Sequence, residues 1–236
     1  MCGRFVISSK LESLRKHFPI DAEAVEIAPN YNVAPTQEIP AIARHDDQNH
    51  LEKFYWGLVP FWAKDKTIGS RMINARYETV ATKPAFRAAL RKRRCLVLAN
   101  GFYEWKQTNG QKQPMFLTLP DGNPFAFAGL WETWDDNGKE PTPYRSCTIL
   151  TREAGASVQP IHNRMPVILK PEVFDLWLDP ENQDVKALQD IIKYRVHTEF
   201  IIVPVSKRVN SIRNNSPENI RPMTSSPQTN LRHRTR

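Results

Sequence analysis

Two turn signals divide the centre of the chain into short apolar segments. Asn109-Gly110 separates EWKQ from PMFLTL, and Asp121-Gly122 separates PMFLTL from PFAFAGLW. Asn-Gly and Asp-Gly pairs readily adopt the positive φ angles of tight hairpin turns. Short runs rich in β-branched and aromatic residues between such turns are typical of strands. The centre of the chain is therefore predicted to form β-hairpins at both turns.

The remaining elements are predicted from periodicity. CGRFVI is expected to be a first strand, and Ser9 to cap a helix whose Leu11, Leu14 and Phe18 recur at helical spacing. A turn at residues 46–49 is expected to join the strands IPAIARH and LEKFYWGLV. Helices are expected around residues 76–81 and 86–94 and in PEVFDLWL and VKALQDIIKYR, and further strands in YRSCTILT, MPVILK and FIIVPV.

These elements predict a single α+β domain over residues 2–223, with a predominantly antiparallel β-sheet core and peripheral helices. No internal repeat or linker divides it. Residues 224–236 are rich in Ser, Thr, Asn and Arg and contain almost nothing to bury, so a disordered basic tail is expected there.

The net charge of +8 favours an anionic partner such as nucleic acid. A dense run of basic residues is nevertheless more often a solvated helix face, which is the interpretation given to Arg87, Arg91, Lys92, Arg93 and Arg94. No apolar run approaches the roughly 20 residues that a membrane helix needs. The N-terminus also lacks the apolar segment of a signal peptide. A cytoplasmic location is expected, associated with the nucleoid if the protein is bacterial.

The three cysteines, Cys2, Cys95 and Cys147, form no CxxC pair, which argues against a disulfide framework and against a zinc site. Cys95 and Cys147 lie in apolar runs and are expected to be inert core residues. Cys2 directly follows Met1, and a small second residue permits removal of Met1. Cys2 would then carry a free amine beside a thiol, and such a 1,2-aminothiol condenses with an aldehyde to a thiazolidine. Its alternative is a buried residue of the first strand.

Four segments carry more aromatic and ionisable residues than their apolar settings require: WGLVPFW (56–62), NAR (74–76), GFYEW (101–105) and HNRMP (162–166). Trp56 and Trp105 are expected to be core aromatics, and Asn74 has the alternative role of satisfying a turn. Glu104 lies in a strand-like run where a carboxylate is costly to bury. Its alternative is a solvent-facing position. His162 has the alternative role of a structural histidine, and no second histidine lies at ligand spacing from it, so no metal and no cofactor are predicted.

Together with Met-Cys-Gly-Arg-Phe at the start, YNVAPTQ near residue 31 and VSKRVNSIRNN near residue 205, these segments resemble the SRAP (SOS-response-associated peptidase) family of abasic-site processing proteins. The resemblance runs from Cys2 to about Met223. It implies a barrel-like fold. It also implies that the protein senses abasic sites in single-stranded DNA, traps them as a thiazolidine crosslink to Cys2 after Met1 removal, and shields the lesion during the DNA damage response.

The resemblance also implies roles for individual residues. Cys2 is the nucleophile, Glu104 shuttles protons, Asn74 orients the opened sugar, and His162 stabilises the adduct or assists its reversal. In addition, Arg4, Arg76 and Arg164 are expected to clamp phosphates, because the guanidinium fork binds their oxygens bidentately, and Trp62 to stack on a base. The expected partner is single-stranded DNA with abasic sites, bound by a monomer.

Two other functions remain open from the residues. Glutamine amidotransferase domains also begin Met-Cys-Gly, and there the Cys2 thiolate would attack a carboxamide. Alternatively, the chain is a non-covalent module for single-stranded DNA in which Cys2 is core. The peptidase name of the family fits self-removal of Met1 better than general proteolysis, because no Ser–His–Asp or Cys–His–Asn pattern is evident.

Overall fold

The computed structural model describes residues 2–108, 110–135 and 142–223, and the predicted basic tail lies outside them. One of its two β-sheets has five strands in the order β14-β9-β8-β1-β3, and every pairing in it is antiparallel. The strands are β1 (Phe5–Ile7), β3 (Asn30–Val33), β8 (Gly101–Thr108), β9 (Gln111–Thr118) and β14 (Ile201–Pro204).

The second sheet closes on itself. Its strands follow the order β12-β11-β10-β7-β4-β5-β2, and β5 also pairs in parallel with β11, so that β4, β5, β7, β10 and β11 form a barrel. β6 and β13 join it beside β11 and β10. The bounds are β2 (Ala22–Glu23), β4 (Glu38–His45), β5 (Gln48–Trp56), β6 (Asn74–Arg76), β7 (Arg94–Ala99), β10 (Phe125–Trp134), β11 (Tyr144–Glu153), β12 (Arg164–Pro166) and β13 (Ile168–Leu169). The α+β fold with an antiparallel, barrel-like core is confirmed.

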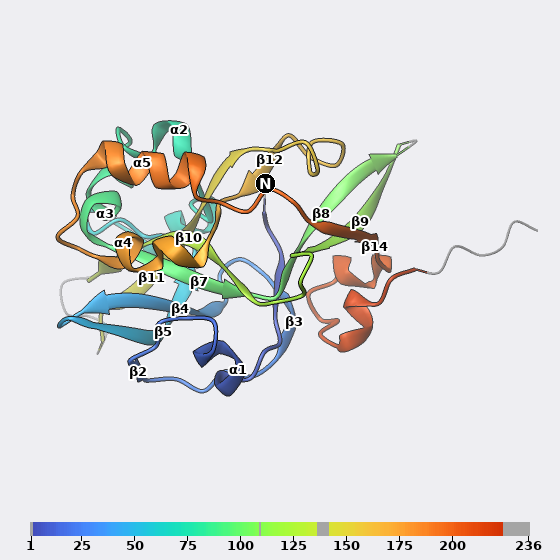
Figure 1. Cartoon of the computed structure of the whole chain (residues 1–236), viewed down its shortest axis with the longest axis horizontal. Coiled ribbons are helices and arrows are strands. Elements are labelled where there is room, and N and C mark those ends of the chain that lie inside the picture. The colour runs from blue at the N-terminus through green and yellow to red at the C-terminus, as the bar shows by residue number, and fades with distance from the viewer. Residues whose placement is uncertain (1, 109, 136–141, 224–236) are drawn as a thin grey trace, which may run out of the picture.

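Short helices cover the outside of the barrel. Figure 1 shows α2 to α5 gathered on one side of the molecule and the β8–β9 hairpin projecting on the other. The α-helices are α1 (Leu11–Arg15), α2 (Tyr77–Val80), α3 (Arg87–Lys92), α4 (Phe174–Leu178) and α5 (Val185–Tyr194), and the 3-10 turns are η1 (Lys66–Arg71), η2 (Pro171–Val173), η3 (Lys207–Asn210) and η4 (Pro217–Ile220). Across the described residues, every helix is too short or too polar to cross a bilayer.

Aromatic edges join the two sheets. The Phe5 ring meets the rings of Trp56 and Phe127 edge-on, with centroids 5.2 and 5.6 Å apart, and Phe102 meets Phe127 in the same way at 6.2 Å. Such pairs add about 0.5–1.5 kcal/mol each beyond the apolar area that they bury. Trp56 is fully buried, as predicted for a core aromatic. This packing holds β1 and β8 against the barrel and so fixes the start of the chain at the junction of the sheets.

A close approach of two glycines positions the loop that follows β5. Gly57 has a φ of +139°, and a Cβ there would lie 2.5 Å from the carbonyl oxygen of Gly69. Only glycine tolerates both conditions without strain. The chain turns at this point to bring Leu58 to the carbonyl of Met72, and it leads directly into the exposed Trp62.

The turn at residues 46–49 was correctly predicted: β4 and β5 pair through it, and Asp46 and Asp47 both have positive φ. The prediction of a β-hairpin at Asp121-Gly122 is wrong. A turn is present, with Gly122 at a φ of +71°, but β9 belongs to the five-stranded sheet and β10 to the barrel. The Asp-Gly pair predicts the local turn, but it does not predict which strand the next strand pairs with.

Two further predictions need correction. The N-cap of α1 is Lys10 and not Ser9, because the Ser9 hydroxyl accepts a hydrogen bond from Asn100 Nδ2 instead. Arg94 is not part of a solvated helix face. It begins β7 and is buried, and its guanidinium donates to the backbone carbonyls of Trp177 and Leu90 among others.

Candidate active site

Cys2 lies just before β1, with its side chain fully buried. Asn74 Nδ2 donates to the Cys2 carbonyl oxygen at 2.7 Å, which holds the start of the chain against β6. Burial, and after it the negative charge of Glu104, raises the pKa of the Cys2 thiol far above its usual range. The resting thiol is therefore protonated, and it needs a proton acceptor before it can attack.

Glu104 lies on β8 opposite Met115, and only 2% of its surface is exposed. The alternative of a solvent-facing position is therefore wrong. Burial raises the pKa of Glu104, although the nearby His162 and the backbone N–H of Trp105 act in the opposite direction. A carboxyl group whose pKa moves toward neutrality is suited to donate and accept a proton at physiological pH.

Asn74 and His162 complete the group around Cys2 and Glu104. The Oδ1 atom of Asn74 is buried without a hydrogen-bond partner in the part of the chain that the structure describes. His162 precedes β12, and its Nδ1 accepts a hydrogen bond from the backbone N–H of Arg164 at 2.9 Å. The four predicted catalytic residues thus converge from the start of the chain, β6, β8 and the loop before β12.

A hollow of about 640 Å³ opens beside this group, and it is lined by Glu104, Trp105, Gln107, Lys112, Ile161, His162 and Asn210. A larger hollow of about 720 Å³, between α4 and α5, contains none of the predicted residues. Concave sites with a few convergent polar groups and a group of perturbed pKa are the usual place for chemistry. The smaller hollow has both properties, so it is the candidate active site.

Two of the predicted phosphate clamps are engaged within the protein. Arg4 Nη1 donates to Asn32 Oδ1 at 2.7 Å and to the Val209 carbonyl oxygen at 2.8 Å. Arg164 forms a bidentate ion pair with Glu78, at 2.6 and 2.9 Å. To bind phosphate in the predicted way, either guanidinium has to share its donors or exchange a partner.

The other two predicted contacts are accessible. Arg76 is exposed at the end of β6, two residues after Asn74 and therefore on the same face of that strand. Trp62 is 49% exposed, and it lines a separate hollow of about 580 Å³ with Lys64 and Arg71. Trp62 does not line the hollow that contains Glu104.

Two asparagines for which no role was predicted also shape the site. Asn32 is buried and donates to the carbonyl oxygens of Ser211 and Asn214, which fastens the segment around η3 to β3. Asn210 in that segment accepts a hydrogen bond at 2.8 Å from Trp105 Nε1, at the rim of the hollow. The only signal in the sequence was the place of these asparagines in the YNVAPTQ and VSKRVNSIRNN motifs.

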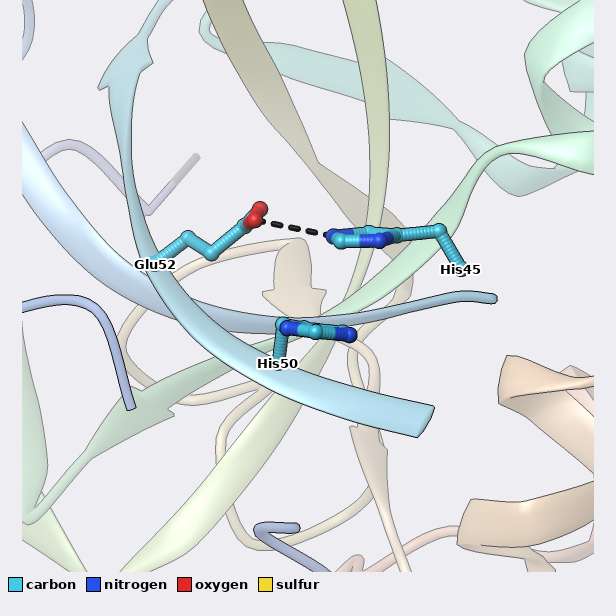
Figure 2. Close-up of side chains that lie close together, drawn as sticks. All are labelled: His45, His50 and Glu52. Atoms are coloured by element: carbon cyan, nitrogen blue, oxygen red, sulfur yellow. Dashed lines mark hydrogen bonds and ion pairs between the residues drawn. The ribbon is translucent and has the colours of Figure 1, made fainter. Parts of the chain in front are cut away.

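A cluster of histidine and glutamate lies elsewhere, on the β4–β5 hairpin (Figure 2). His45 Nε2 is 2.9 Å from Glu52 Oε1, and the His45 and His50 rings stack with centroids 3.8 Å apart and planes 10° from parallel. A metal ion lies close to the plane of each imidazole that binds it, which two stacked rings cannot both provide. Arg145 also pairs with Glu52 at 2.6 Å. As arranged, this cluster stabilises the hairpin and does not form a metal site.

Comparison with known proteins finds relatives that match along most of the chain. The profile of the SOS response associated peptidase (SRAP) family matches residues 1–212. The abasic site processing protein YoqW of Bacillus subtilis is 44% identical over 221 residues, covering 92% of this chain and 98% of the relative. The abasic site processing protein YedK of Escherichia coli is 32% identical, covering 94% of this chain and 100% of the relative.

A crystal structure of a Bacteroides thetaiotaomicron protein has the same fold, with a TM-score of 0.79 at 23% identity over 94% of this chain and 100% of that one. The family profile matches most of the chain, and both curated relatives match along nearly their whole length. The chain therefore belongs to the SOS response associated peptidase family.

Proposed function

We propose that this protein captures abasic sites in single-stranded DNA as a covalent crosslink through Cys2. Curated relatives that match nearly the whole chain are named abasic site processing proteins. The observation that carries the proposal is the convergence of Cys2, Asn74, Glu104 and His162 beside one open hollow. The proposed reaction is of the lyase type, because the ring C–O bond of the abasic sugar breaks by elimination, without hydrolysis, as the aldehyde C=O bond forms.

The proposed chemistry uses both groups of a Cys2 freed from Met1. The amine adds to the aldehyde and the resulting imine forms with loss of water. The thiol then adds to the imine carbon and closes a thiazolidine, so that the overall reaction releases one water. Because amine and thiol are on adjacent carbons, ring closure is intramolecular, where effective molarities reach about 10⁵ M or more.

Glu104 is the proposed proton shuttle. Its raised pKa favours the protonated acid, which can donate to the departing hydroxyl of the carbinolamine. The carboxylate left behind can accept the proton that the thiol loses on attack. This second step supplies the proton acceptor that the Cys2 thiol needs, since the pKa of that thiol is itself raised.

Asn74 and His162 have supporting roles in the proposal. The Asn74 amide already holds the Cys2 carbonyl, and its buried Oδ1 has no hydrogen-bond partner among the described residues, so it is available to a hydroxyl of the opened sugar. His162 faces the same hollow and is proposed to stabilise the adduct or assist its reversal. Self-removal of Met1 is proposed as the peptidase activity that the family name describes.

The DNA contacts are proposed around this centre. Arg76 and Trp62 are exposed and are proposed to bind a phosphate and a base, and Arg4 and Arg164 to add phosphate contacts by sharing their donors. The protein is proposed to act as a monomer in the cytoplasm, without a metal or cofactor.

The test uses single-stranded DNA with one abasic site and looks for a heat-stable shifted band. Wild-type protein is expected to give the band, and Cys2→Ala to give none, because alanine keeps an amine but cannot close the ring. A stable adduct from Cys2→Ala would exclude the mechanism. Glutaminase activity without crosslinking would favour the amidohydrolase, and binding without either activity would favour a non-covalent module.

A further inference from the structure

The hollow that contains Glu104 and His162 is lined by one cation, Lys112, and by none of the predicted arginines among the described residues. Arg4 and Arg164 are occupied by Asn32, Val209 and Glu78. By contrast, Lys112 on β9 is exposed and lines the hollow that contains Glu104 and His162. Over residues 2–108, 110–135 and 142–223, Lys112 forms no ion pair.

Lys112 belongs to a wall of hydrogen-bond donors. It pairs with Gln107 across the β8–β9 hairpin, so both side chains lie on the same face, and both line the hollow together with Asn210. Asn210 is held in place because its Oδ1 accepts from Trp105 Nε1, which leaves its amide nitrogen as the donor group of this side chain. We refer to Gln107, Lys112 and Asn210 as the hairpin wall.

The charge around the hairpin wall is positive. Lys207 on η3 is exposed and donates to Gln111, which precedes Lys112 on β9, at 3.0 Å. Among the residues that the structure describes, Glu104 is the one carboxyl group that lines the same hollow, and burial favours its neutral form. An anionic chain that enters this hollow therefore meets ammonium and amide donors and little opposing charge.

We propose that the hairpin wall binds the phosphate backbone of the DNA strand on one side of the captured abasic site. This inference rests on the proposed function, because Glu104 and His162 line the same hollow as the wall. A DNA strand whose abasic sugar reaches Cys2 beside that hollow has to continue past one of its sides. Lysine and amide donors contact phosphates without reading the base sequence. The contact is therefore independent of sequence and sensitive to salt.

Lys112→Gln tests this inference, because it removes the charge and keeps a polar side chain of similar length. Lys186→Gln, on the exposed face of α5 on the far side of the molecule, is the matched control. Each phosphate contact on a single strand contributes a salt slope of about 0.7, so its loss is expected to weaken binding about fivefold at about 0.1 M salt. Lys186→Gln is expected to match wild type.

Three oligonucleotides locate the contact: the abasic site at the centre, at the 5′ end, or at the 3′ end. Lys112→Gln is expected to slow crosslinking of limiting protein on the central site and on one of the two end sites. Equal behaviour of Lys112→Gln and Lys186→Gln on all three would overturn the inference, and so would equal slowing at both ends, which indicates a diffuse charge effect.

A second measurement separates this inference from the proposed function. Fluorescence anisotropy with unmodified single-stranded DNA reports the wall without any chemistry. A weaker affinity and smaller salt slope for Lys112→Gln support the wall even if wild-type protein forms no crosslink, in which case the proposed function fails alone. If Lys112→Gln has the affinity and salt slope of wild type, and wild-type protein forms the crosslink, the inference about the hairpin wall fails and the proposed function stands.

Discussion

Glu104 is a carboxyl group in a position that water barely reaches, and this has a thermodynamic consequence. Because burial raises its pKa, the folded protein binds this proton more tightly than the unfolded chain does. Its contribution to stability is therefore fully present below about pH 4.3, the ordinary pKa of glutamate, and is lost as the pH rises through the raised value. Above the raised pKa, ionisation of this buried carboxyl group lowers the stability of the fold.

Glu104→Gln is predicted to raise the stability of the protein and to slow its crosslinking reaction. The amide keeps the size of the side chain and never ionises, so the melting temperature at pH 7 is expected to rise by about 2–4 °C. The gain over wild type should shrink as the pH falls from 8 to 5. Crosslinking is expected to slow about 10²-fold, within the range for lost acid–base catalysis. Calorimetry and single-turnover kinetics check this prediction, and a wild-type rate would contradict the proposed role of Glu104.

At the residue scale, the sequence predicted which side chains lie close together. It did not predict which hydrogen bonds and ion pairs they form. Cys2, Asn74, Glu104 and His162 converge, and their motifs indicated this. The Arg164 pair with Glu78 was not predictable, because the two residues are far apart in sequence and the pairing depends on how β12 docks on β11.

At the scale of elements, alternating apolar patterns predicted most strands, and the errors arose where tertiary partners decide the outcome. The turn at Gly122 connects two sheets, which local sequence does not determine. Arg94 follows a basic helix in sequence but is the first residue of β7. Its guanidinium donates hydrogen bonds to the ends of other elements. It donates to the carbonyl oxygens of Leu90 and Arg91 at the end of α3 and of Trp177 in α4. A buried arginine that satisfies several carbonyl groups locks these elements together.

Arg94→Met is predicted to destabilise the protein by about 3 kcal/mol or more, because it leaves several buried carbonyl oxygens without donors. Methionine fills a similar volume, so loss of packing contributes little. The matched control is Arg91→Met, which changes an exposed side chain of α3 and should remain within about 0.5 kcal/mol of wild type. Urea unfolding measures both variants. Equal stability of the two would show that the carbonyl contacts of Arg94 contribute nothing.

At the scale of the whole molecule, the start of the chain lies where the two sheets meet. β1 is paired on both sides, with β3 and β8, and its Phe5 packs on the barrel. Sequence periodicity predicted the antiparallel core, but the closure of the barrel through the parallel β5–β11 pairing requires knowledge of which distant strands meet. The position of Cys2 therefore depends on the assembled fold and not on its neighbours in sequence.

Insertion of one alanine between Met1 and Cys2 is predicted to abolish crosslinking and to leave DNA binding intact. The amine of Cys2 then becomes an amide, which cannot form an imine, whereas the proposed DNA contacts other than Arg4 lie on other elements. Mass spectrometry of active wild-type protein is expected to show a mature chain that begins at Cys2. Full activity in protein that still carries Met1 would refute the requirement for a free amine.

The pairing of β1 with β8 also sets an order of events during synthesis. Cys2 leaves the ribosome early, whereas β8, which pairs with β1 and carries Glu104, lies about 100 residues later. At the usual rate of protein synthesis, about 5–20 residues per second, Cys2 is exposed to solvent for about 5–20 s before β8 has been made. During that interval its thiol has the ordinary reactivity of an exposed cysteine toward cellular aldehydes and oxidants. Pairing of β1 with β8 ends this exposure, so the assembled fold itself shields the Cys2 thiol from these reagents.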